Sequence, residues 1–453
     1  MNLIQITPGA GGMYCGNCFR DNALVAALRQ RGHEVLMVPL YLPMTLDEEN
    51  QSAGTPTFFG GINVYLQQQS AFFRRAPKWL HSLLDSPFLL KLAAGRAAKT
   101  RAADVGELSL SMLRGEEGNQ ARELDELLAW LKTQPKPDVV MFSNAMLVGL
   151  ARKLKAELGC KIVCNLQGED AFLDSMPSPH REQVWSLLAE RCRDCDLFIA
   201  PSRYFGDTMA KRLNLPADKL KVVFNGISLE GYGSNQCSVF SVQSEGAGAS
   251  TASALNTEHC LLNTSSPTLG YFARMCREKG LDLLVETFIE LKRRNRVPNL
   301  KLKVGGGCGP GDEPFVAQLR KHLRRAGCLD DVEFHPNLTR EQKVSFLQSL
   351  TVFSVPALYG EGFGLYLIEA LAAGVPVVQP RHAAFPELVE ATGGGLIAEA
   401  NATALAAAIE SLLLDPARLR AFGEAGHRAV AERFTMEQMA TGVAAALERL
   451  RTR

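Results

Sequence analysis

Short apolar runs alternate with helix-period stretches along most of the chain. The two sets of predicted strands are residues 2–7, 34–38, 138–143, 161–166, 196–200 and 220–224, and then 268–272, 300–304, 331–335, 351–355, 376–379 and 395–398. Amphipathic segments such as 21–31 and 281–294 separate these runs. Strands that alternate with helices predict parallel sheets covered on both faces, so the pattern predicts two doubly wound, Rossmann-like α/β domains.

Three regions depart from this alternation. Residues 45–135 are too long for a single crossover and must hold extra helices. Residues 233–266 are rich in Ser, Gly, Ala, Thr and Asn, which favours a linker or a flexible flap. A final helix predicted at about 435–452 follows the last strand and does not connect two strands of a sheet. We therefore predict a first domain at 1–225 with a helical insertion at about 45–135, a linker at 226–266, a second domain at 267–434 and a terminal helix at 435–453.

Composition narrows the class of protein. The 453 residues, 46% of them hydrophobic, are enough for more than one core. Lys and Arg number 49 against 48 Asp and Glu, so no global charge points to nucleic acid as a partner. The first residues lack a basic region followed by an apolar run, and no apolar stretch reaches the roughly 18 residues of a membrane span. We expect a cytoplasmic protein.

Two C-x-x-C pairs, Cys15/Cys18 and Cys192/Cys195, raise the question of a zinc site. The first pair follows the first predicted strand, whereas the second precedes the strand 196–200, so the pairs belong to opposite edges of the sheet. The Asp-Cys-Asp run at 194–196 resembles a metal-binding pattern but also precedes its strand, and we interpret it as a helix end. The 11 cysteines are expected to be reduced, and no metal is predicted.

Common nucleotide fingerprints do not fit the glycine spacing. A dinucleotide-binding G-x-G-x-x-G after the first strand would need glycine at position 14, which is Tyr14. Starting from Gly305 or Gly307, the third glycine position is occupied by Pro310 or Asp312. No G-x-x-x-x-G-K-[ST] sequence is present. These spacings argue against a nicotinamide dehydrogenase and a P-loop nucleotide hydrolase, and no cofactor is predicted.

The stretch EGFGLYLIE, residues 361–369, predicts an anion site at the start of a helix. Its first amides belong to Gly362, Phe363, Gly364 and Leu365, and free N–H groups at a helix start favour a phosphate. Glu369 lies about one turn further in, where a carboxylate suits a ribose diol beside that phosphate. Glu361 lies in the loop, where it can accept hydrogen bonds from sugar hydroxyls. The alternative is that both are solvated glutamates that flank a core helix.

A second anion signal comes from Arg274 and Lys279. Arg274 follows the strand 268–272, and Lys279 stands at the start of the next helix, where the helix dipole disfavours a cation. An anion between the two side chains would explain that placement. Together with the amides at 362–365, they could neutralise a diphosphate leaving group without a metal.

The run SVPALYGEGFGLYLIEALAAGVPVV resembles the signature of retaining glycosyltransferases of family 4, which have the GT-B fold. Two glutamates separated by seven residues and an R-x(4)-K pattern after the first strand of the second domain are its hallmarks. Similar stretches are PGAGGM at 8–13, APSRYF at 200–205, VVFNGI at 222–227, PEL at 386–388 and AERFTMEQMA at 431–440.

The resemblance implies two Rossmann-like domains facing a central cleft, with the last helix crossing back to the first domain. It implies that Glu369 binds the nucleotide ribose, that Glu361 contacts the donor sugar, and that Arg274 and Lys279 stabilise the leaving group. It also implies that a loop containing Gly11 and Gly12 closes over the donor phosphates.

Two departures from the family pattern stand out. Gln167 follows the fourth strand where relatives often have histidine, and glutamine cannot take up a proton at neutral pH. Ala383 and Ala384 stand where two glycines are expected. Asp170 and Arg203 are, with Gln167, candidates for the acceptor and sugar side of the site.

The sequence does not identify the acceptor. Residues 70–103 are basic, with interleaved aromatic and leucine side chains. This pattern fits contact with a membrane surface or with an anionic acceptor. The interpretation we favour is that these residues form helices packed on the domain with a solvated basic face. We predict a metal-independent, retaining glycosyltransferase that uses a nucleotide-diphosphate sugar and a hydroxyl acceptor, whether a sugar, a glycerate-like compound or a lipid-linked one. The alternatives are a sugar-nucleotide epimerase, for which no acid and base residues are evident, and a non-catalytic sugar-nucleotide-binding or scaffold protein.

Overall fold

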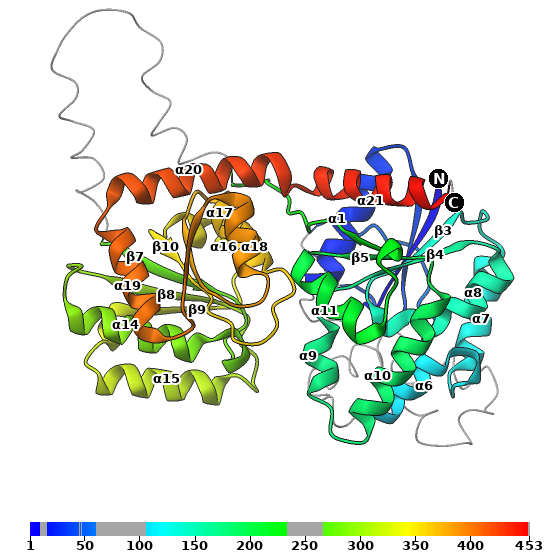
Figure 1. Ribbon diagram of the computed structural model, residues 1–453, viewed down its shortest axis with the longest axis horizontal. Helices are drawn as coiled ribbons and strands as arrows, with labels where there is room; N and C mark the ends of the chain where they lie inside the picture. Colours follow the sequence, from blue (N-terminus) through cyan, green and yellow to red (C-terminus); the bar gives the residue numbers. More distant parts are fainter. Residues whose placement is uncertain (10–15, 45, 47, 60–105, 233–265, 452–453) are drawn as a thin grey trace, which may run out of the picture. The chain divides into compact units, whose positions relative to one another are not determined.

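A computed structural model describes residues 1–9, 16–44, 46, 48–59, 106–232 and 266–451 of the protein. The chain forms two compact units, one made of Met1–Gly226 and Met436–Arg453 and the other of Ile227–Thr435. Each unit is built on one six-stranded parallel sheet with helices on both faces (Figure 1). The predicted doubly wound α/β fold is confirmed in both units.

The first unit contains β1 (Asn2–Thr7), β2 (Glu34–Pro39), β3 (Val139–Phe142), β4 (Lys161–Asn165), β5 (Leu197–Ala200) and β6 (Leu220–Val222). They lie in the order β2-β1-β3-β4-β5-β6. The order of the chain reverses between β1 and β3, where Leu3 pairs with Val139. Open sheets of this kind bind ligands outside the carboxyl ends of the strands at such a reversal.

Helices cover the two faces of the first sheet. They are α1 (Gly16–Gln30), α6 (Gly106–Arg114), α7 (Ala121–Leu131), α8 (Ala151–Leu158), α9 (Glu169–Asp174), α10 (His180–Arg191), α11 (Arg203–Leu213) and α21 (Met436–Arg451). Because successive strand residues point to opposite faces, Val139 belongs to the core under α1 and α21, whereas Val140 belongs to the core on the other face. The alternation therefore gives this unit two apolar cores.

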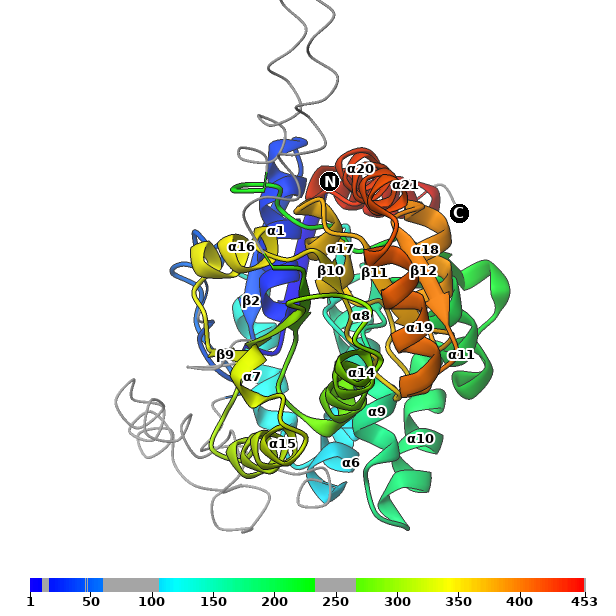
Figure 2. The same ribbon diagram turned by 90° about the vertical axis from the view of Figure 1, so that its left-hand side faces the viewer.

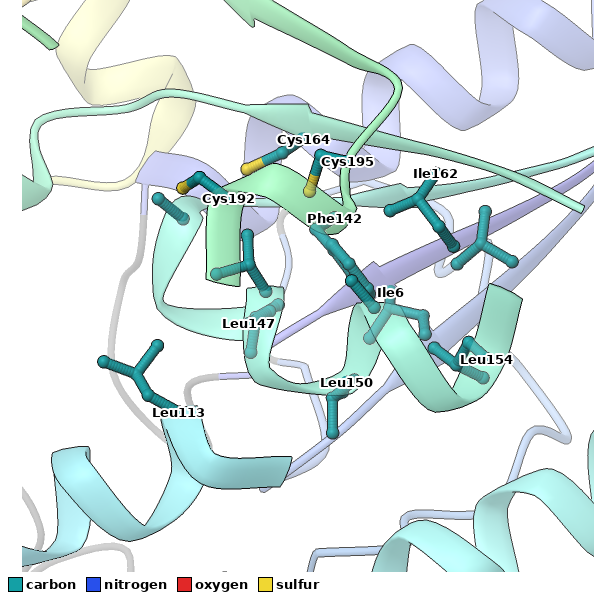
Figure 3. Close-up of a cluster of buried hydrophobic side chains, with 14 of the residues drawn as sticks. Ile6, Leu113, Phe142, Leu147, Leu150, Leu154, Ile162, Cys164, Cys192 and Cys195 are labelled. Carbon is teal, nitrogen blue, oxygen red and sulfur yellow. The ribbon is translucent and has the colours of Figure 1, made fainter. Parts of the chain in front are cut away.

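Four cysteines lie in the second of these cores, namely Cys160, Cys164, Cys192 and Cys195. Cys164, Cys192 and Cys195 are buried and unpaired, close to Phe142 and Leu147 (Figure 3). Burial raises the pKa of each of the three thiols. The prediction of ordinary buried thiols is confirmed for this C-x-x-C pair, whereas Cys15 lies outside the described residues.

The Asp-Cys-Asp run has a structural role in the first unit. A 3-10 turn, Cys192–Asp194, ends within it, as predicted. The carboxylate of Asp196 accepts hydrogen bonds from the backbone N–H of Ile162 at 2.8 Å and from Nζ of Lys155 at 2.7 Å. Asp196 therefore ties the start of β5 to β4. Within the part of the chain that the structure describes, no group of three or more His, Cys, Asp or Glu side chains is arranged to hold a metal ion.

The second unit contains β7 (Thr268–Phe272), β8 (Lys301–Gly306), β9 (Val332–Pro336), β10 (Val352–Phe353), β11 (Val377–Pro380) and β12 (Gly395–Ala398). Their order is β12-β11-β10-β7-β8-β9, so the chain reverses between β7 and β10. All twelve predicted strands are present in the two units, each within two residues of its predicted ends.

The helices of the second unit are α14 (Leu281–Arg294), α15 (Glu313–Arg325), α16 (Arg340–Gln348), α17 (Leu365–Ala372), α18 (Phe385–Thr392), α19 (Ala402–Leu413) and α20 (Pro416–Arg433). Figure 2 shows α14 beside α19, and these two helices pack together. A 3-10 turn, Arg277–Lys279, precedes α14. No helix in the described ranges is both long and apolar enough to cross a membrane.

The chain enters and leaves the second unit at adjacent points. The backbone N–H of Ile227 donates to the carbonyl of Phe434 at 2.9 Å, and Ile227 pairs with Thr435 in a parallel bridge. The last helix, α21, then packs on α1, with Val443 and Leu447 in the same core as Leu24. The predicted return of the final helix to the first domain is confirmed.

Candidate active site

The predicted anion-binding residues converge on the carboxyl edge of the second sheet. Arg274 and Lys279 follow β7, and Glu361 lies in the loop after β10. Since β7 and β10 are neighbours at the reversal of the chain, their trailing loops meet where this class of sheet binds ligands. The sequence separates Lys279 from Glu361, and the sheet order brings them together.

A glycine fixes the position of Lys279. The 3-10 turn ends at Lys279, and Gly280 follows with φ of +70°. A Cβ at Gly280 would lie 2.0 Å from the carbonyl oxygen of Pro356, so a side chain cannot be accommodated there. The turn is therefore pressed against the loop that leads to Glu361.

Lys279 and Glu361 form a half-buried ion pair. Nζ of Lys279 lies 2.6 Å from Oε2 of Glu361, and their side chains are 21% and 13% exposed. Lys279 also donates to the hydroxyl of Tyr359, and the hydroxyl of Tyr366 donates to Oε2 of Glu361 at 2.8 Å. The Lys279 ammonium lies 4.9 Å from the ring centroid of Tyr359 and 5.2 Å from that of Tyr366. Two aromatic rings thus restrict the ammonium, as in other cation–π arrangements.

Both members of the pair are held in their charged forms. Burial by itself lowers the pKa of Lys279, but the charge and hydrogen bond of Glu361, together with Tyr359, outweigh it and raise that pKa. Burial likewise acts to raise the pKa of Glu361, and the Lys279 charge reverses the effect and lowers it. Burial and the charge of Glu361 raise the pKa of Tyr359 to about 12. Near neutral pH the group contains one ammonium, one carboxylate and neutral tyrosines.

The glycine-rich stretch before α17 turns the chain into the helix. Gly364 is the N-cap residue with φ of +93°, a conformation that residues with a side chain rarely adopt. Gly362 and Phe363 are buried, and the ring of Phe363 packs 6.3 Å from that of Phe434. The helix begins at Leu365, so the predicted phosphate-binding amides lie in this turn and at the first residue of α17.

The second glutamate of the motif, Glu369, lies in α17 and faces α16. Its Oε1 accepts a hydrogen bond from Nζ of Lys343 at 2.7 Å. The two side chains are 23% and 19% exposed, for Lys343 and Glu369 respectively. This pairing was not predicted, because nothing in the sequence indicates which helix packs beside α17.

Arg274 has a partner of its own. The side chain of Asp312, in the loop after β8, binds the Arg274 guanidinium in a bidentate manner, with Nη2 to Oδ1 at 2.9 Å and Nε to Oδ2 at 3.1 Å. The hydrogen bond to Asp312 raises the pKa of Arg274. The Arg274 side chain is 65% exposed, whereas that of Asp312 is 10% exposed. Asp312 therefore anchors the guanidinium while most of it faces outward.

The two alanines that replace the expected glycines are tied to the backbone of Glu361 through Ala384. The backbone N–H of Ala384 donates to the carbonyl of Glu361 at 3.3 Å. Ala383 has φ of +51°, in the left-handed region that glycine adopts without strain. The backbone thus keeps the conformation typical of glycine although the side chain is present.

The acceptor-side candidates lie at the carboxyl edge of the first sheet. Gln167 follows β4, Asp170 lies in α9, and Arg203 is the exposed first residue of α11, which follows β5. Oε1 of Gln167 accepts a hydrogen bond from Nδ2 of Asn225 at 3.3 Å. Burial raises the pKa of Asp170, whose Oδ1 has no hydrogen-bond partner among the described residues. Gly11, Gly12 and the basic segment 70–103 lie outside the described residues.

Glu169, which was not predicted, organises this edge. Its Oε1 accepts from the backbone N–H of Ala145 at 2.7 Å, and its Oε2 accepts from that of Gln167 at 2.8 Å. Burial raises the pKa of Glu169, and the two backbone hydrogen bonds oppose that shift. The carboxylate ties the loop after β3 to Gln167, just before the start of α9, which contains Asp170.

A buried ion pair lies at the chain reversal of the first sheet. Arg20 and Asp21 are neighbours in α1, with Nε of Arg20 3.0 Å from Oδ1 of Asp21, and their side chains are 1% and 0% exposed. Nη2 of Arg20 also donates to the carbonyl of Ser143 after β3, at 3.2 Å. Oδ2 of Asp21 has no partner within the described residues. The pair joins the start of α1 to the end of β3.

Several functional partners escaped the sequence analysis for a common reason. Each of them contacts a charged residue far away in the sequence: Tyr359 and Tyr366 contact Lys279, Asp312 contacts Arg274, and Lys343 contacts Glu369. Tyr366 also contacts Glu361, five residues away. Asp312 offered one signal, because it follows a predicted strand within a glycine-rich loop. The tyrosines lie inside or beside the 361–369 motif but have no spacing that distinguishes them from core residues.

Two sequence families match the chain in separate regions. Residues 257–429 match Glycosyl transferases group 1, and residues 93–230 match Glycosyltransferase Family 4. The lipopolysaccharide core biosynthesis mannosyltransferase LpsB of Rhizobium meliloti (strain 1021) is 32% identical over 197 residues, which is 42% of this chain and 53% of that protein.

A second relative is the GDP-mannose-dependent alpha-(1-6)-phosphatidylinositol monomannoside mannosyltransferase of Mycolicibacterium smegmatis. It is 31% identical over 167 residues, which is 35% of this chain and 42% of that protein. The chain therefore spans about half the length of these curated relatives.

Solved structures resemble the whole chain. Anabaena Alr3699/HepE in complex with UDP superposes with a TM-score of 0.65 at 15% identity, covering 99% of this chain and 100% of that one. Sucrose-phosphate synthase from Thermosynechococcus elongatus gives a TM-score of 0.66 at 17% identity and covers 99% of both chains. At these identities the likeness establishes the fold, which is GT-B.

Residues 93–230 and 257–429 thus have the sequence pattern of glycosyltransferases of the family 4 and group 1 type, and the chain has the GT-B fold. The sequence-based family prediction is confirmed.

Proposed function

We propose that this protein transfers a hexosyl group from a nucleotide-diphosphate sugar to a hydroxyl acceptor, with retention of the anomeric configuration and without a metal ion. The observation that carries the proposal is the Lys279–Glu361 ion pair at the reversal of the second sheet, with the Arg274–Asp312 pair at the same carboxyl edge. Cations at a carboxyl edge beside a helix start suit a diphosphate flanked by a sugar.

The donor occupies this edge in a defined direction. The amides at Gly362–Leu365 bind a phosphate of the donor, Glu369 accepts the ribose hydroxyls, and Glu361 accepts hydroxyls of the transferred sugar. Relatives that are named GDP-mannose-dependent, and a structural neighbour that holds UDP-glucose, support a nucleotide sugar as the donor class.

Lys279 and Arg274 stabilise the departing diphosphate. As the bond between the anomeric carbon and the phosphate oxygen breaks, negative charge builds up on that oxygen, and fixed cations lower the barrier. One well-placed group of this kind contributes about 3–4 kcal/mol. Lys279 is pre-oriented by Glu361 and two tyrosine rings, so little reorganisation is needed during the reaction. These two cations supply the charge compensation that a metal ion would otherwise provide.

In this proposal a phosphate group of the donor, and not a protein side chain, deprotonates the acceptor hydroxyl. The acceptor oxygen forms its bond to the anomeric carbon on the face that the diphosphate leaves, and a phosphate oxygen of that diphosphate takes the acceptor proton. Gln167, Asp170 and Arg203 bind the acceptor or the sugar in this scheme. The acceptor is a hydroxyl compound such as a sugar or a lipid-linked sugar, as the names of the relatives suggest for those proteins. The thiols of Cys164, Cys192 and Cys195 are free, which suits a reducing compartment such as the cytoplasm.

The test is incubation with a panel of UDP and GDP sugars in the absence of acceptor. Slow release of free sugar supports a transferase, and NMR of the first-formed anomer reports retention. An epimerised nucleotide sugar would instead indicate a sugar-nucleotide epimerase, and no binding or turnover with any donor would indicate a scaffold. Excess EDTA should leave the rate unchanged, whereas a full loss restored by Mg²⁺ would contradict the metal-free proposal.

A further inference from the structure

Lys343 lies outside the family motif but touches one of its two glutamates. The ammonium of Lys343, in α16, donates to Oε1 of Glu369, in α17, at 2.7 Å. Within the described residues, the other carboxylate oxygen of Glu369 has no protein hydrogen-bond partner. One oxygen is therefore bound by the protein, and the other is available to a ligand.

The start of α16 fixes where Lys343 stands. The hydroxyl of Thr339 accepts from the backbone N–H of Gln342, and Oε1 of Gln342 accepts from the backbone N–H of Thr339 at 3.0 Å. This capping box sets the first turn of the helix. The backbone N–H of Lys343 donates to the carbonyl of Thr339 at 2.8 Å, which places its side chain one turn into α16.

Packing along the buried face of α16, on and beside the side that carries Lys343, prevents the helix from rotating. Leu347 is fully buried, and Nε2 of Gln348 donates to the carbonyl of Gly231 at 3.3 Å. Val344 packs beside Gly231. The Lys343 side chain therefore reaches Glu369 from a helix that is held at its start and along its buried face.

The surroundings of Glu369 make a counter-charge necessary. Tyr232 is buried nearby, and its pKa is raised by burial and further by the charge of Glu369, while Arg340 acts in the opposite direction. A carboxylate that is mostly withdrawn from water is costly unless it is paired. Lys343 provides that pairing.

We propose that Lys343 is a positioning residue that orients the Glu369 carboxylate toward the ribose 2′ and 3′ hydroxyls and thereby sets a preference for ribonucleotides over 2′-deoxyribonucleotides. The inference rests on the proposed function, because it takes Glu369 as the ribose-binding group. A carboxylate fixed at Oε1 accepts a vicinal diol with less loss of side-chain freedom than a mobile one. Without the lysine, the carboxylate can turn away, and the ribose contact weakens.

The experiment compares Lys343→Met and Lys343→Arg with the wild type. Isothermal titration calorimetry gives Kd for UDP, 2′-deoxy-UDP, GDP and 2′-deoxy-GDP with each protein. We expect the wild type to bind the ribonucleotide more tightly than its 2′-deoxy form, for whichever of the two bases it accepts. Lys343→Met should weaken ribonucleotide binding about tenfold and bring the ratio of the two Kd values close to one, because a hydrogen bond to a charged group is lost. Lys343→Arg should restore most of the ratio.

Lys292→Met is the matched control. Lys292 also forms a 2.7 Å ion pair, with Asp331, and its side chain is 26% exposed, against 23% for Lys343. Neither residue of that control pair belongs to the proposed site, so the ratio of Kd values should equal that of the wild type. The ratio is measured within one preparation and does not depend on the folded fraction. Lys343→Gln replaces Lys343→Met if the latter does not fold.

Glu369→Gln separates failure of this inference from failure of the proposed function. If Glu369→Gln abolishes the ribose preference but Lys343→Met leaves it unchanged, Lys343 is not a positioning residue and the inference is overturned. If neither variant changes the ratio, or the wild type binds no nucleotide, the ribose role of Glu369 fails and both proposals fall.

Discussion

The ammonium of Lys279 lies 2.6 Å from Oε2 of Glu361 at the chain reversal of the second sheet. Arg274, by contrast, is anchored by Asp312 and remains 65% exposed. The two cations of the R-x(4)-K pattern therefore have different structural roles. Both members of the Lys279–Glu361 pair are mostly withdrawn from water, whereas the pair of Arg274 with Asp312 is exposed on the arginine side, where water screens the charge.

Lys279→Ala and Arg274→Ala should each slow transfer by at least about 100-fold, because each removes a group that stabilises the leaving diphosphate. The two variants should differ in stability. Lys279→Ala should lower the free energy of unfolding by about 3–5 kcal/mol, since Glu361 loses its partner. Arg274→Ala should destabilise less than Lys279→Ala, because the guanidinium is 65% exposed and water screens its pair with Asp312. Urea unfolding and initial rates measure both effects, and near-wild-type turnover in both variants would contradict the leaving-group assignment.

The stability that Glu361 contributes should depend on pH in a defined direction. The pKa of Glu361 is lowered in the folded state, so its contribution is present above the ordinary value of 4.5 and is lost as the pH falls through the lowered pKa. The pKa of Lys279 is raised, so its contribution is present below the ordinary value of 10.5 and is lost as the pH rises through the raised pKa. The difference in unfolding free energy between wild type and Glu361→Gln should be flat from about pH 6 to about pH 9 and should shrink in acid. A difference that grows in acid would show that the pair is not ionised as described.

Ala383→Gly should stabilise the protein by about 0.5–1 kcal/mol. Alanine pays about 1–2 kcal/mol to adopt the left-handed conformation found at Ala383, and the added flexibility of glycine in the unfolded chain offsets only part of that gain. Ala407→Gly, the same substitution at an exposed position inside α19, should destabilise by about 1 kcal/mol. Opposite shifts of the thermal midpoint are the expected result, and shifts of the same sign would argue against strain at Ala383.

Asp21→Asn should destabilise the first unit by about 3–5 kcal/mol, because it leaves the guanidinium of Arg20 buried without its counter-charge. The matched control is Glu182→Gln. Arg181 and Glu182 are also sequence neighbours, 2.7 Å apart, but their side chains are 45% and 53% exposed. The control should unfold at nearly the wild-type urea midpoint. Equal midpoints for the two variants would mean that burial of the Arg20–Asp21 pair has no energetic consequence.

Tyr366→Phe should reduce turnover without abolishing it. The hydroxyl of Tyr366 donates to the oxygen of Glu361 that also binds Lys279, whereas the ring stays in place in the variant. Losing one hydrogen bond to a charged group costs about 1.5–3 kcal/mol, so kcat should fall about tenfold or more. Initial-rate kinetics with a fixed donor measures the effect, and an unchanged kcat would remove Tyr366 from the site.

Local sequence pattern was sufficient to predict the architecture and to single out the principal charged residues of the candidate site. Twelve apolar runs separated by amphipathic segments predicted both parallel sheets, since a strand buried on both faces needs a continuous apolar run and a crossover helix. Glu361, Glu369, Arg274 and Lys279 could be singled out because each follows a strand or borders a helix start. Such positions are recognisable from neighbouring residues alone.

The partners of these residues depended on the tertiary structure. Asp312, Lys343 and Tyr366 matter because the sheet order puts the loops after β7, β8 and β10 together and because α16 packs beside α17. Neither fact follows from local periodicity, since sheet order and helix pairing arise from contacts between distant segments. Ala383 is a further case, because the surrounding structure imposes a backbone conformation that alanine itself disfavours. Short-range propensity fixes where elements begin and end, whereas long-range packing decides which charges face each other.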